Sequence, residues 1–297
     1  MEKRAFGKTD MQVSVLGFGG AEIGFENASP HIVKELLTAA IDQGLNVIDT
    51  AECYVGSEEL IGNAVSNRRK EFYLFSKCGH GQNTKGEWSK AQITACIDRS
   101  LMRLKTDYLD LVQLHSCGLD ILKKGECIEA LQEARKAGKT RYIGYSGDGA
   151  DAQFAVDSKL FDALQISVNI ADQEPIDTVL EDARKQGMGV IAKRPIANAA
   201  WKSKSKPSNS YHVPYWERLQ KLNFDFIGKE ASEAVSTALR FTLSVPGVDV
   251  AIVGTTKPGR WRENADFIAS GKLSEKEFAE IRARWADKVE ADWVGQT

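Results

Sequence analysis

Four ionisable side chains with complementary chemistry occur at or just after the ends of apolar segments of the chain. Asp49, Lys77 and His115 each close one such segment, and Tyr54 follows Asp49 by five residues. A single lysine at a strand end is usually solvated, and a single histidine is usually a satisfied structural residue. A charged group that ends a strand buried on both faces needs a partner, however, so we expect Asp49 and Lys77 to pair.

Together these groups predict acid–base chemistry on an oxygen atom. The ordinary pKa of a phenol is about 10, which is too high for easy proton donation and return at neutral pH. A nearby ammonium such as that of Lys77 stabilises the phenolate and lowers the pKa of Tyr54. Asp49 is expected to keep Lys77 charged and fixed, and His115 to hydrogen-bond the oxygen on which charge develops.

The elements that must position these groups alternate between strand-like and helix-like segments. Continuously apolar runs, typical of strands buried on both faces, occur eight times, at residues 13–16, 45–49, 72–77, 108–115, 141–146, 163–169, 190–193 and 248–254. Stripes of apolar residues at helical spacing lie between them, for example Val33, Leu36, Leu37, Ala40 and Ile41.

Eight strands, each followed by a helix, predict a closed parallel (β/α)8 barrel of the α/β class. An open doubly wound sheet is the rival, and periodicity alone does not separate the two. We expect one domain over residues 1–297, with a long irregular loop at about 197–228 after the seventh strand and an extra C-terminal helix at about 274–288. In a barrel, the carboxyl ends of all strands open onto one face, which brings the four groups together.

Composition narrows the classes of function. Lys and Arg total 39 and Asp and Glu total 41, which gives a net charge of −2 and no basic surplus for nucleic acid. No apolar run is long enough to span a bilayer, and no secretion signal is visible, so we expect a cytoplasmic protein with no membrane partner. The five cysteines are odd in number and irregularly spaced, and the four histidines lack metal-ligand spacing, so no disulfide frame and no metal site is expected.

Two glycine-rich segments fail as nucleotide-binding motifs. Residues 17–22 place Glu22 where a dinucleotide fingerprint needs glycine, and no helix follows at once. Residues 254–261 have the glycine spacing of a phosphate loop but lack the lysine and hydroxyl residue that must follow, because Arg260 and Trp261 stand there.

Six short motifs in order nevertheless resemble the aldo-keto reductase superfamily. They comprise residues 46–58, Lys77, and residues 107–115, 138–146, 192–197 and 252–264. The resemblance covers residues 4–270 and includes the catalytic set Asp49, Tyr54, Lys77 and His115. It implies a barrel that binds a nicotinamide cofactor without a Rossmann fold, and reversible, NADPH-dependent reduction of a small aldehyde or ketone, with NADH as a possible cofactor.

The resemblance also implies roles for further residues. The glycine-rich turn Gly19, Gly20 and Ala21 faces the nicotinamide and pyrophosphate, Asp49 belongs to the cofactor site as well, and Ser146 and Gln165 bond the carboxamide. The adenosine end is surrounded by Gly254, Thr255, Thr256, Lys257, Arg260, Glu263 and Asn264. Lys257 and Arg260 bracket a helix start, where backbone N–H groups favour a phosphate.

The chain departs from the family pattern at two positions. Gly147 and Asp148 follow Ser146 where the family usually has asparagine, so one carboxamide donor is lost or moved. Lys193 and Arg194 stand where an aromatic ring often stacks on the nicotinamide, and a cation there could lower the affinity for the oxidised cofactor. Cys53, Cys78 and Cys117 are expected to be neutral packing residues.

Aromatic and apolar residues of the active-face loops are candidates for the substrate pocket: Ile23, Phe25, Trp88, Trp201, Tyr211, Tyr215 and Trp216. Two other functions stay open at this point. One is a cofactor-binding regulatory barrel that serves a partner protein with little turnover, and the other is an epimerase that uses its cofactor internally. The sequence does not indicate an oligomeric state.

Overall fold

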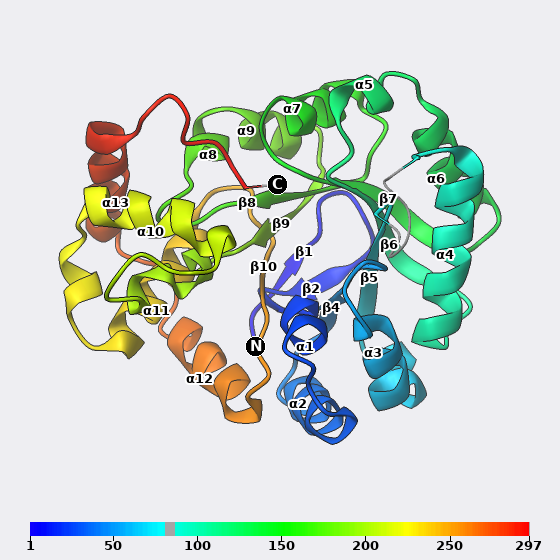
Figure 1. The fold of residues 1–297 in the computed structure, drawn as a ribbon, viewed down its shortest axis with the longest axis horizontal. Helices are drawn as coiled ribbons and strands as arrows, with labels where there is room; N and C mark the ends of the chain where they lie inside the picture. Colours follow the sequence, from blue (N-terminus) through cyan, green and yellow to red (C-terminus); the bar gives the residue numbers. More distant parts are fainter. Residues whose placement is uncertain (81–86, 297) are drawn as a thin grey trace.

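The computed structural model describes residues 1–80 and 87–296, and its centre is a closed parallel barrel (Figure 1). Neighbouring strands pair in chain order, and the last strand, β10, pairs with the first, β3. The predicted (β/α)8 barrel is confirmed, and the open sheet is not found. The barrel strands are β3 (Leu16–Gly19), β4 (Val47–Asp49), β5 (Tyr73–Cys78), β6 (Leu109–His115), β7 (Thr140–Ser146), β8 (Ala163–Ser167), β9 (Gly189–Lys193) and β10 (Val250–Val253).

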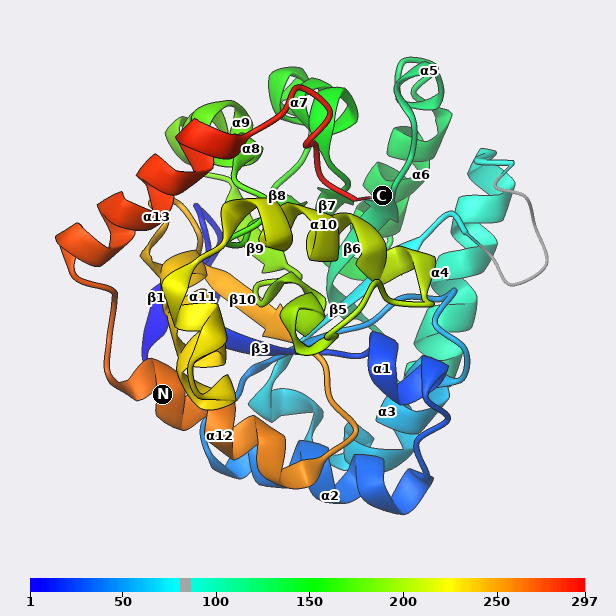
Figure 2. The ribbon, with the colours of Figure 1, turned by 60° about the vertical axis from the view of Figure 1, so that its left-hand side comes forward.

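Helices surround the barrel and cover the outer face of its strands (Figures 1 and 2). The described α-helices are α1 (Ala21–Phe25), α2 (Pro30–Asp42), α3 (Ser57–Val65), α4 (Lys90–Leu104), α5 (Leu119–Leu122), α6 (Glu126–Lys136), α7 (Gly149–Ser158), α8 (Glu174–Asp177), α9 (Val179–Lys185), α10 (Val213–Leu222), α11 (Ala231–Ser244), α12 (Pro258–Ala269) and α13 (Glu275–Lys288). Short 3-10 helices are η1 (Ser66–Glu71), η2 (Ala197–Lys202), η3 (Ser210–His212) and η4 (Asp225–Gly228).

Local signals in the sequence explain where individual helices begin. Ser29 accepts a hydrogen bond from the backbone N–H of Ile32 and caps α2, which starts with a proline. Ser274 and Glu277 form a reciprocal capping box at the start of α13. Among the described helices, none is long and apolar enough to cross a membrane.

The start of the barrel differs from the prediction, because the apolar run at residues 13–16 belongs to two strands. β1 (Lys3–Ala5) and β2 (Gln12–Ser14) form an antiparallel hairpin, and the barrel strand begins only at Leu16. Phe6, Met11 and Val13 of the hairpin are fully buried, and they pack against residues near the start of barrel strands such as Val47. Val13 is therefore apolar because the hairpin plugs the N-terminal end of the barrel.

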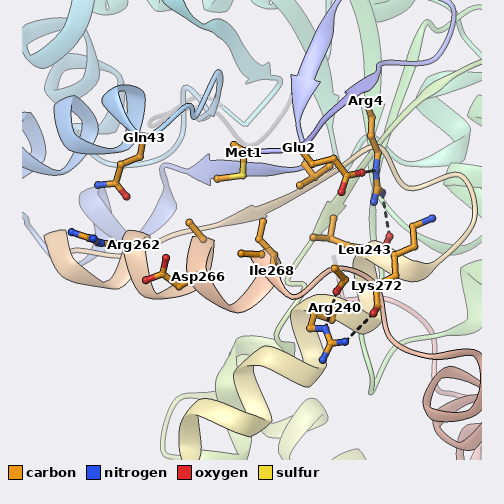
Figure 3. A pocket seen from close by; sticks show the side chains of 14 residues that line it. Met1, Glu2, Arg4, Gln43, Arg240, Leu243, Arg262, Asp266, Ile268 and Lys272 are labelled. Atoms are coloured by element: carbon orange, nitrogen blue, oxygen red, sulfur yellow. Dashed lines mark hydrogen bonds and ion pairs between the residues drawn. The ribbon is translucent and has the colours of Figure 1, made fainter.

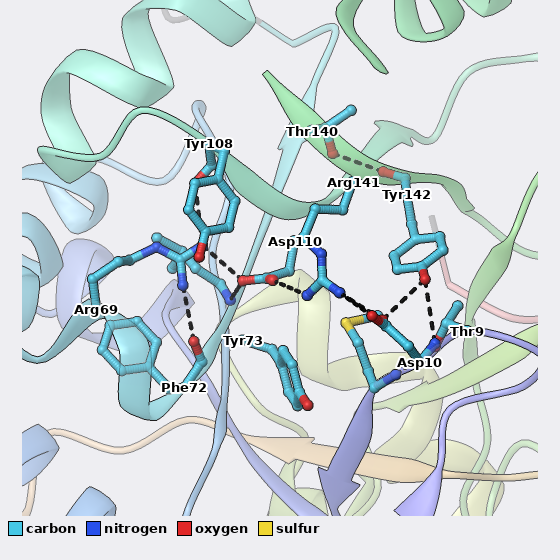
Figure 4. A network of polar contacts seen from close by, with 12 residues as sticks. Thr9, Asp10, Arg69, Phe72, Tyr73, Tyr108, Asp110, Thr140, Arg141 and Tyr142 are labelled. Atoms are coloured by element: carbon cyan, nitrogen blue, oxygen red, sulfur yellow. Dashed lines mark hydrogen bonds and ion pairs between the residues drawn. The ribbon is translucent and has the colours of Figure 1, made fainter. Parts of the chain in front are cut away.

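A chain of ion pairs fixes the same end of the barrel from outside (Figure 4). The buried carboxylate of Asp110 on β6 accepts hydrogen bonds from Arg69 and from Arg141, both at 2.7 Å. Arg141 continues to Asp10 of the hairpin, whose carboxylate also accepts from the hydroxyl of Tyr142. These contacts hold strands β5 to β7 and the hairpin in register, far from the strand ends that carry the predicted site.

Two segments cover the opposite, C-terminal end of the barrel. The stretch at residues 197–228, predicted as an irregular loop, contains the ten-residue helix α10, because Tyr215, Leu219 and Leu222 bury one of its faces. After α13 the last residues turn back toward the centre of the barrel (Figure 1). Arg218 of α10 donates to the backbone carbonyl of Val294 at 2.7 Å, which ties this C-terminal segment to α10.

Candidate active site

The four predicted catalytic residues converge at the C-terminal end of the barrel. The ammonium of Lys77 bonds the carboxylate of Asp49 and donates to the backbone carbonyl of Thr50 at 2.9 Å. Its Nζ atom lies 5.1 Å from the centroid of the Tyr54 ring. The ring of Tyr54 meets the imidazole of His115 edge-on, with 5.7 Å between centroids. The sequence therefore predicted which of these side chains come together.

Strand register explains the convergence. Val47, Phe75 and Leu111 belong to the core inside the barrel, and side chains on one strand face alternate sides. Two residues further along each strand, Asp49 and Lys77 therefore also face inward, and His115 does so four residues after Leu111. Tyr54 is not on a strand; it lies in the turn between β4 and α3.

The carboxylate of Asp49 is the hub of a buried hydrogen-bond network. One oxygen accepts from Lys77, and the other accepts from the side-chain amides of Gln165 at 2.9 Å and Gln113 at 3.2 Å. The hydroxyl of Ser146 in turn donates to Gln165 at 3.2 Å. Gln113 was not predicted as a site residue, although it is a lone amide in an apolar strand, two residues before His115.

The net shift in the pKa of Tyr54 is opposite to the one expected from the sequence. Burial raises the pKa of Tyr54 to about 12, and the ammonium of Lys77 acts against this rise without reversing it. Burial opposes the charge on Lys77, but Asp49 and Tyr54 favour it, and the net effect raises the pKa of Lys77. A charged Lys77 beside a protonated Tyr54 is therefore the favoured state at neutral pH.

His115 is a neutral imidazole in this setting. Burial, together with the positive charges of Lys77 and Lys193, holds the pKa of His115 well below its ordinary value. The thiol of Cys53 lies 3.4 Å from Nδ1 of His115. The centroid of the His80 ring lies 5.5 Å from that of His115 and 5.3 Å from that of Trp88.

The glycine-rich turn after β3 lies beside the end of β10. Gly20 donates to the backbone carbonyl of Asp49 at 2.7 Å, and a Cβ added there would come within 2.8 Å of the hydroxyl of Ser57. Ala21 begins the short helix α1. A Cβ added at Gly254 would overlap the carboxylate of Glu22, so this acid lies directly on the end of β10. Burial raises the pKa of Glu22, with a smaller contribution from Glu26.

Three cations gather where the adenosine phosphate was expected. Lys257 is the residue before α12, and Arg260 lies in the first turn of that helix, ion-paired with Glu263 at 2.6 Å. Burial and the charges of Arg260 and Lys257 lower the pKa of Lys202, which indicates that this lysine of η2 lies near both of them. Lys202 was predicted only as part of a loop, because no local pattern in the sequence shows which loop lysine lies near α12.

Hydroxyls of the same segment already have partners in the chain. Thr255 accepts from the backbone N–H of Lys257 at 3.1 Å, and Thr256 donates to Glu26 at 2.7 Å. Two acidic residues of the α1 region, Glu22 and Glu26, therefore contact the segment Gly254–Thr256.

The unsatisfied polar atoms of this region fit a dinucleotide. Asn264 has a buried side-chain oxygen with no hydrogen-bond partner among the described residues, which suits the amino group of an adenine. The side-chain nitrogens of Asn198 and Trp201 are likewise buried and unpaired among those residues, and donors of this kind suit phosphate oxygens. With the three cations, these atoms would offer a nucleotide both charge partners and hydrogen bonds.

At the position expected to stack on a nicotinamide, the two cations have protein partners. Lys193 pairs with the buried carboxylate of Asp148 at 2.8 Å, and burial lowers the pKa of Lys193. Arg194 donates to the hydroxyl of Ser167 at 2.6 Å and to the phenol of Tyr211 at 2.5 Å. Asp148, two residues after Ser146, therefore pairs with Lys193 and lies 3.8 Å from the guanidinium of Arg194.

The residues predicted to line a substrate pocket separate into two groups. Ile23 and Tyr215 are fully buried, Ile23 in the core and Tyr215 through a hydrogen bond to Asp172 at 2.7 Å. They pack the structure and do not face a pocket. Phe25 is 60% exposed, and its ring lies 5.6 Å from that of Tyr54.

The remaining pocket candidates sit on the covering segments. Trp88 is nearly buried beside His80, and Tyr211 is exposed at the rim. Trp201 belongs to η2 next to Lys202, and Trp216 donates to the backbone of Ser203 at 2.9 Å. Of the predicted pocket residues, Phe25 has a ring contact with the catalytic Tyr54, and Trp88 has one with His80.

A groove of about 600 Å³ lies elsewhere, between the N-terminal residues, α11 and α12 (Figure 3). Its walls include Arg4, Arg240, Arg262 and Lys272, and none of the predicted site residues belongs to it. Arg4 and Arg240 use their guanidinium groups to bond backbone carbonyls, so they act there as structural clamps. The groove adjoins the hairpin end of the barrel, and the chemistry belongs to the other end.

Comparison with known proteins agrees with this geometry. The model of the aldo/keto reductase family matches residues 15–286. An uncharacterised oxidoreductase of Bacillus subtilis, YqkF, is 29% identical, with 95% of this chain and 96% of that protein covered. The holo form of aldo-keto reductase AKR11C1 from Bacillus halodurans superposes with a TM-score of 0.83, at 25% identity and 99% coverage of both chains. An aldo/keto reductase from Klebsiella pneumoniae in complex with NADP and acetate superposes with a TM-score of 0.75, at 27% identity and coverage of 95% and 94%.

Proposed function

The chain belongs to the aldo/keto reductase family and is an NAD(P)H-dependent oxidoreductase, and from this premise we propose that it reduces a small aldehyde or ketone to an alcohol, reversibly, with NADPH. Tyr54 supplies the proton in this proposal. The observation that carries it is the buried arrangement in which Asp49 holds Lys77 beside the ring of Tyr54.

The side chains divide the work on the carbonyl group. The cofactor, when bound, supplies the hydride to the carbonyl carbon. Tyr54 donates its phenolic proton to the carbonyl oxygen, and the ammonium of Lys77 stabilises the phenolate that remains. Asp49 keeps Lys77 charged and in place, since a buried ammonium without a partner would lose its proton. Neutral His115 donates a hydrogen bond to the same carbonyl oxygen.

Binding of the cofactor is assigned to two sets of residues. The turn Gly19, Gly20 and Ala21 is assigned to the nicotinamide half of the cofactor. Ser146 and Gln165 are assigned to its carboxamide, because Gln165 bonds Asp49 and Ser146 bonds Gln165. Lys202, Lys257 and Arg260 hold the 2′-phosphate that distinguishes NADPH from NADH, and Asn264 accepts from the adenine. The bound NADP of the Klebsiella pneumoniae relative supports this choice, and NADH remains a weaker substitute.

The substrate is a small carbonyl compound in this account. Phe25 beside Tyr54, and Trp88 beside His80, give the mouth of the site an aromatic rim suited to an apolar or ring-containing group. A net charge of −2 gives no support to a nucleic-acid partner.

Steady-state turnover of NADPH with a panel of aldehydes and ketones tests the proposal. The proposal predicts one NADPH oxidised for each alcohol formed. A regulatory barrel would bind NADPH and show no substrate-dependent oxidation. An internal epimerase would form product with no net oxidation of the cofactor.

A further inference from the structure

We propose that Cys53 is a positioning residue that fixes the tautomer of His115, so that the Nε2 nitrogen carries the proton offered to the carbonyl oxygen. The inference deepens the proposed function and rests on it for its catalytic consequence. The sequence had suggested only a packing role for this thiol.

The contact itself is direct. The Sγ atom of Cys53 lies 3.4 Å from Nδ1 of His115, within hydrogen-bond distance for sulfur. Cys53 sits immediately before Tyr54 in the turn after β4. This turn is held by backbone hydrogen bonds from Glu52 to Lys77 at 3.1 Å and from Tyr54 to Ala51 at 3.0 Å.

The backbone on the histidine side is anchored as well. The residue after His115, Ser116, has a positive φ of 54° and donates its backbone N–H to the carbonyl of Ser146 at 2.7 Å. The imidazole is packed between the edge of Tyr54 and the ring of His80. The ring therefore has little freedom to turn away from the thiol.

The direction of the hydrogen bond follows from the charge states of the two groups. Burial raises the pKa of Cys53 to about 11, so the sulfur keeps its proton at neutral pH. The pKa of His115 is held well below its ordinary value by burial and by nearby cations, so the ring is neutral and carries one N–H. The sulfur of a thiol is only a weak acceptor, whereas an unprotonated imidazole nitrogen accepts readily, so we assign Cys53 S–H as the donor to Nδ1 and place the N–H of the ring at Nε2.

The other ring nitrogen is free for a ligand. Nε2 of His115 has no hydrogen-bond partner among the described residues, whereas Nδ1 has the thiol. With the opposite tautomer, Nε2 would present a lone pair to the carbonyl oxygen, and two acceptors would meet. Cys53 thus acts on the reaction only through His115 and does not touch the reacting atoms.

Nitrogen-15 NMR of the histidine side chains tests the tautomer in the cofactor-free protein. The chain has four histidines, and the His115→Asn variant identifies the signals of His115. We expect wild type to show a protonated Nε2 and an Nδ1 whose shift indicates an accepted hydrogen bond. Cys53→Ser retains a donor and should keep this pattern, whereas Cys53→Ala should lose the Nδ1 signature. Cys127→Ala, which removes a buried thiol on α6, is the matched control and should change nothing.

Kinetics test the catalytic consequence. Loss of a neutral hydrogen bond corresponds to a change of about 3- to 10-fold in an equilibrium or rate. We expect Cys53→Ala to lower kcat by about that factor with little change in NADPH affinity, and Cys53→Ser to restore most of it. In the His115→Asn background, Cys53→Ala should have no further effect, because its partner is already absent.

Two results would overturn the inference. One is a protonated Nδ1 in the wild-type spectrum, and the other is an Nδ1 shift that is the same in wild type and in Cys53→Ala. If the NMR pattern is as expected but no carbonyl compound is reduced, the proposed function fails while the assigned tautomer stands. A protein that reduces carbonyls and yet shows either overturning spectrum keeps the proposed function and loses this inference.

Discussion

Replacement of Lys202 by methionine should weaken the binding of NADPH and leave NADH nearly unaffected. Lys202 projects from η2 toward Lys257 and Arg260, and burial together with these two charges lowers its pKa. Glu263 offsets part of the positive charge of these three cations, and a 2′-phosphate, which NADPH offers and NADH lacks, is an anion that would offset more of it.

The size of the effect follows from the kind of contact. A charge-assisted hydrogen bond contributes about 1.5–3 kcal/mol, or about 10- to 100-fold in Kd. Lys202 is exposed, so the low end applies, and we expect about tenfold weaker NADPH binding in Lys202→Met. Lys257→Ala together with Arg260→Ala removes two cations and should cost at least as much as Lys202→Met does, although Arg260 shares its guanidinium with Glu263.

The assay is fluorescence titration of the cofactor-free protein with NADPH and with NADH at two ionic strengths. Salt should weaken NADPH binding to wild type more than to Lys202→Met, because part of the screened charge is gone in the variant. Raising the pH through the lowered pKa of Lys202 should weaken NADPH binding selectively, since the lysine loses its charge. The matched control is Lys204→Met, a lysine of the same loop for which no contact with α12 is seen. Equal losses for NADH and NADPH in Lys202→Met would refute the assignment of a phosphate clamp.

Four further substitutions test the catalytic pair, the cofactor site and the stability of the fold. Lys77→Met removes an ammonium that lies 5.1 Å from the centroid of the Tyr54 ring, which corresponds to a Coulomb energy of about 3 kcal/mol at an effective dielectric constant of about 20, so kcat should fall roughly 10²-fold. Asp49→Asn should lower kcat less, and unchanged pH–rate profiles in both variants would make the pair merely structural. Glu22→Gln removes a half-buried carboxylate that lies against Gly254, so NADPH should bind more tightly at neutral pH and gain less on acidification than in wild type. Identical Kd values for the variant and wild type at all pH values would contradict this. Burial raises the pKa of Asp172 from 3.8 to about 7, so the folded state binds the proton more tightly than the unfolded state does. The free energy of unfolding should therefore fall by up to about 4 kcal/mol as the pH rises from about 4 to about 7, and urea unfolding of Asp172→Asn should lack most of this fall.

The sequence was most informative where burial on two faces made the pattern simple. Asp49, Lys77 and His115 stood out because each ended an apolar run, and parallel strands place such ends on one face of a barrel. Tyr54 could be added from its spacing after Asp49 and from the resemblance to the family.

Contacts between distant segments were harder to predict. Val13 is apolar because it packs in the hairpin at the N-terminal end of the barrel. No local pattern in the sequence shows where the hairpin ends and the first barrel strand begins. Lys202 reaches α12 across a gap of more than fifty residues, and its spacing carries no trace of that contact. The partnership of Asp148 with Lys193 likewise joins the ends of two strands through the fold alone.

Charge states were the least accessible property. The ammonium of Lys77 does act to lower the pKa of Tyr54, as expected from the residue types, but the cost of burial is larger. Ile23 and Tyr215 lie in the right segments for a pocket, and only packing shows that their side chains point into the core.

The most direct test of the central claim is turnover by Tyr54→Phe. The variant keeps the aromatic ring and should bind NADPH nearly as well as wild type, while kcat for an aldehyde falls roughly 10²- to 10⁴-fold. NADPH oxidation and alcohol formation should be measured together, so that binding, turnover and stoichiometry come from one preparation. Near-normal turnover by Tyr54→Phe, with its NADPH affinity intact, would contradict the assignment of Tyr54 as the proton donor.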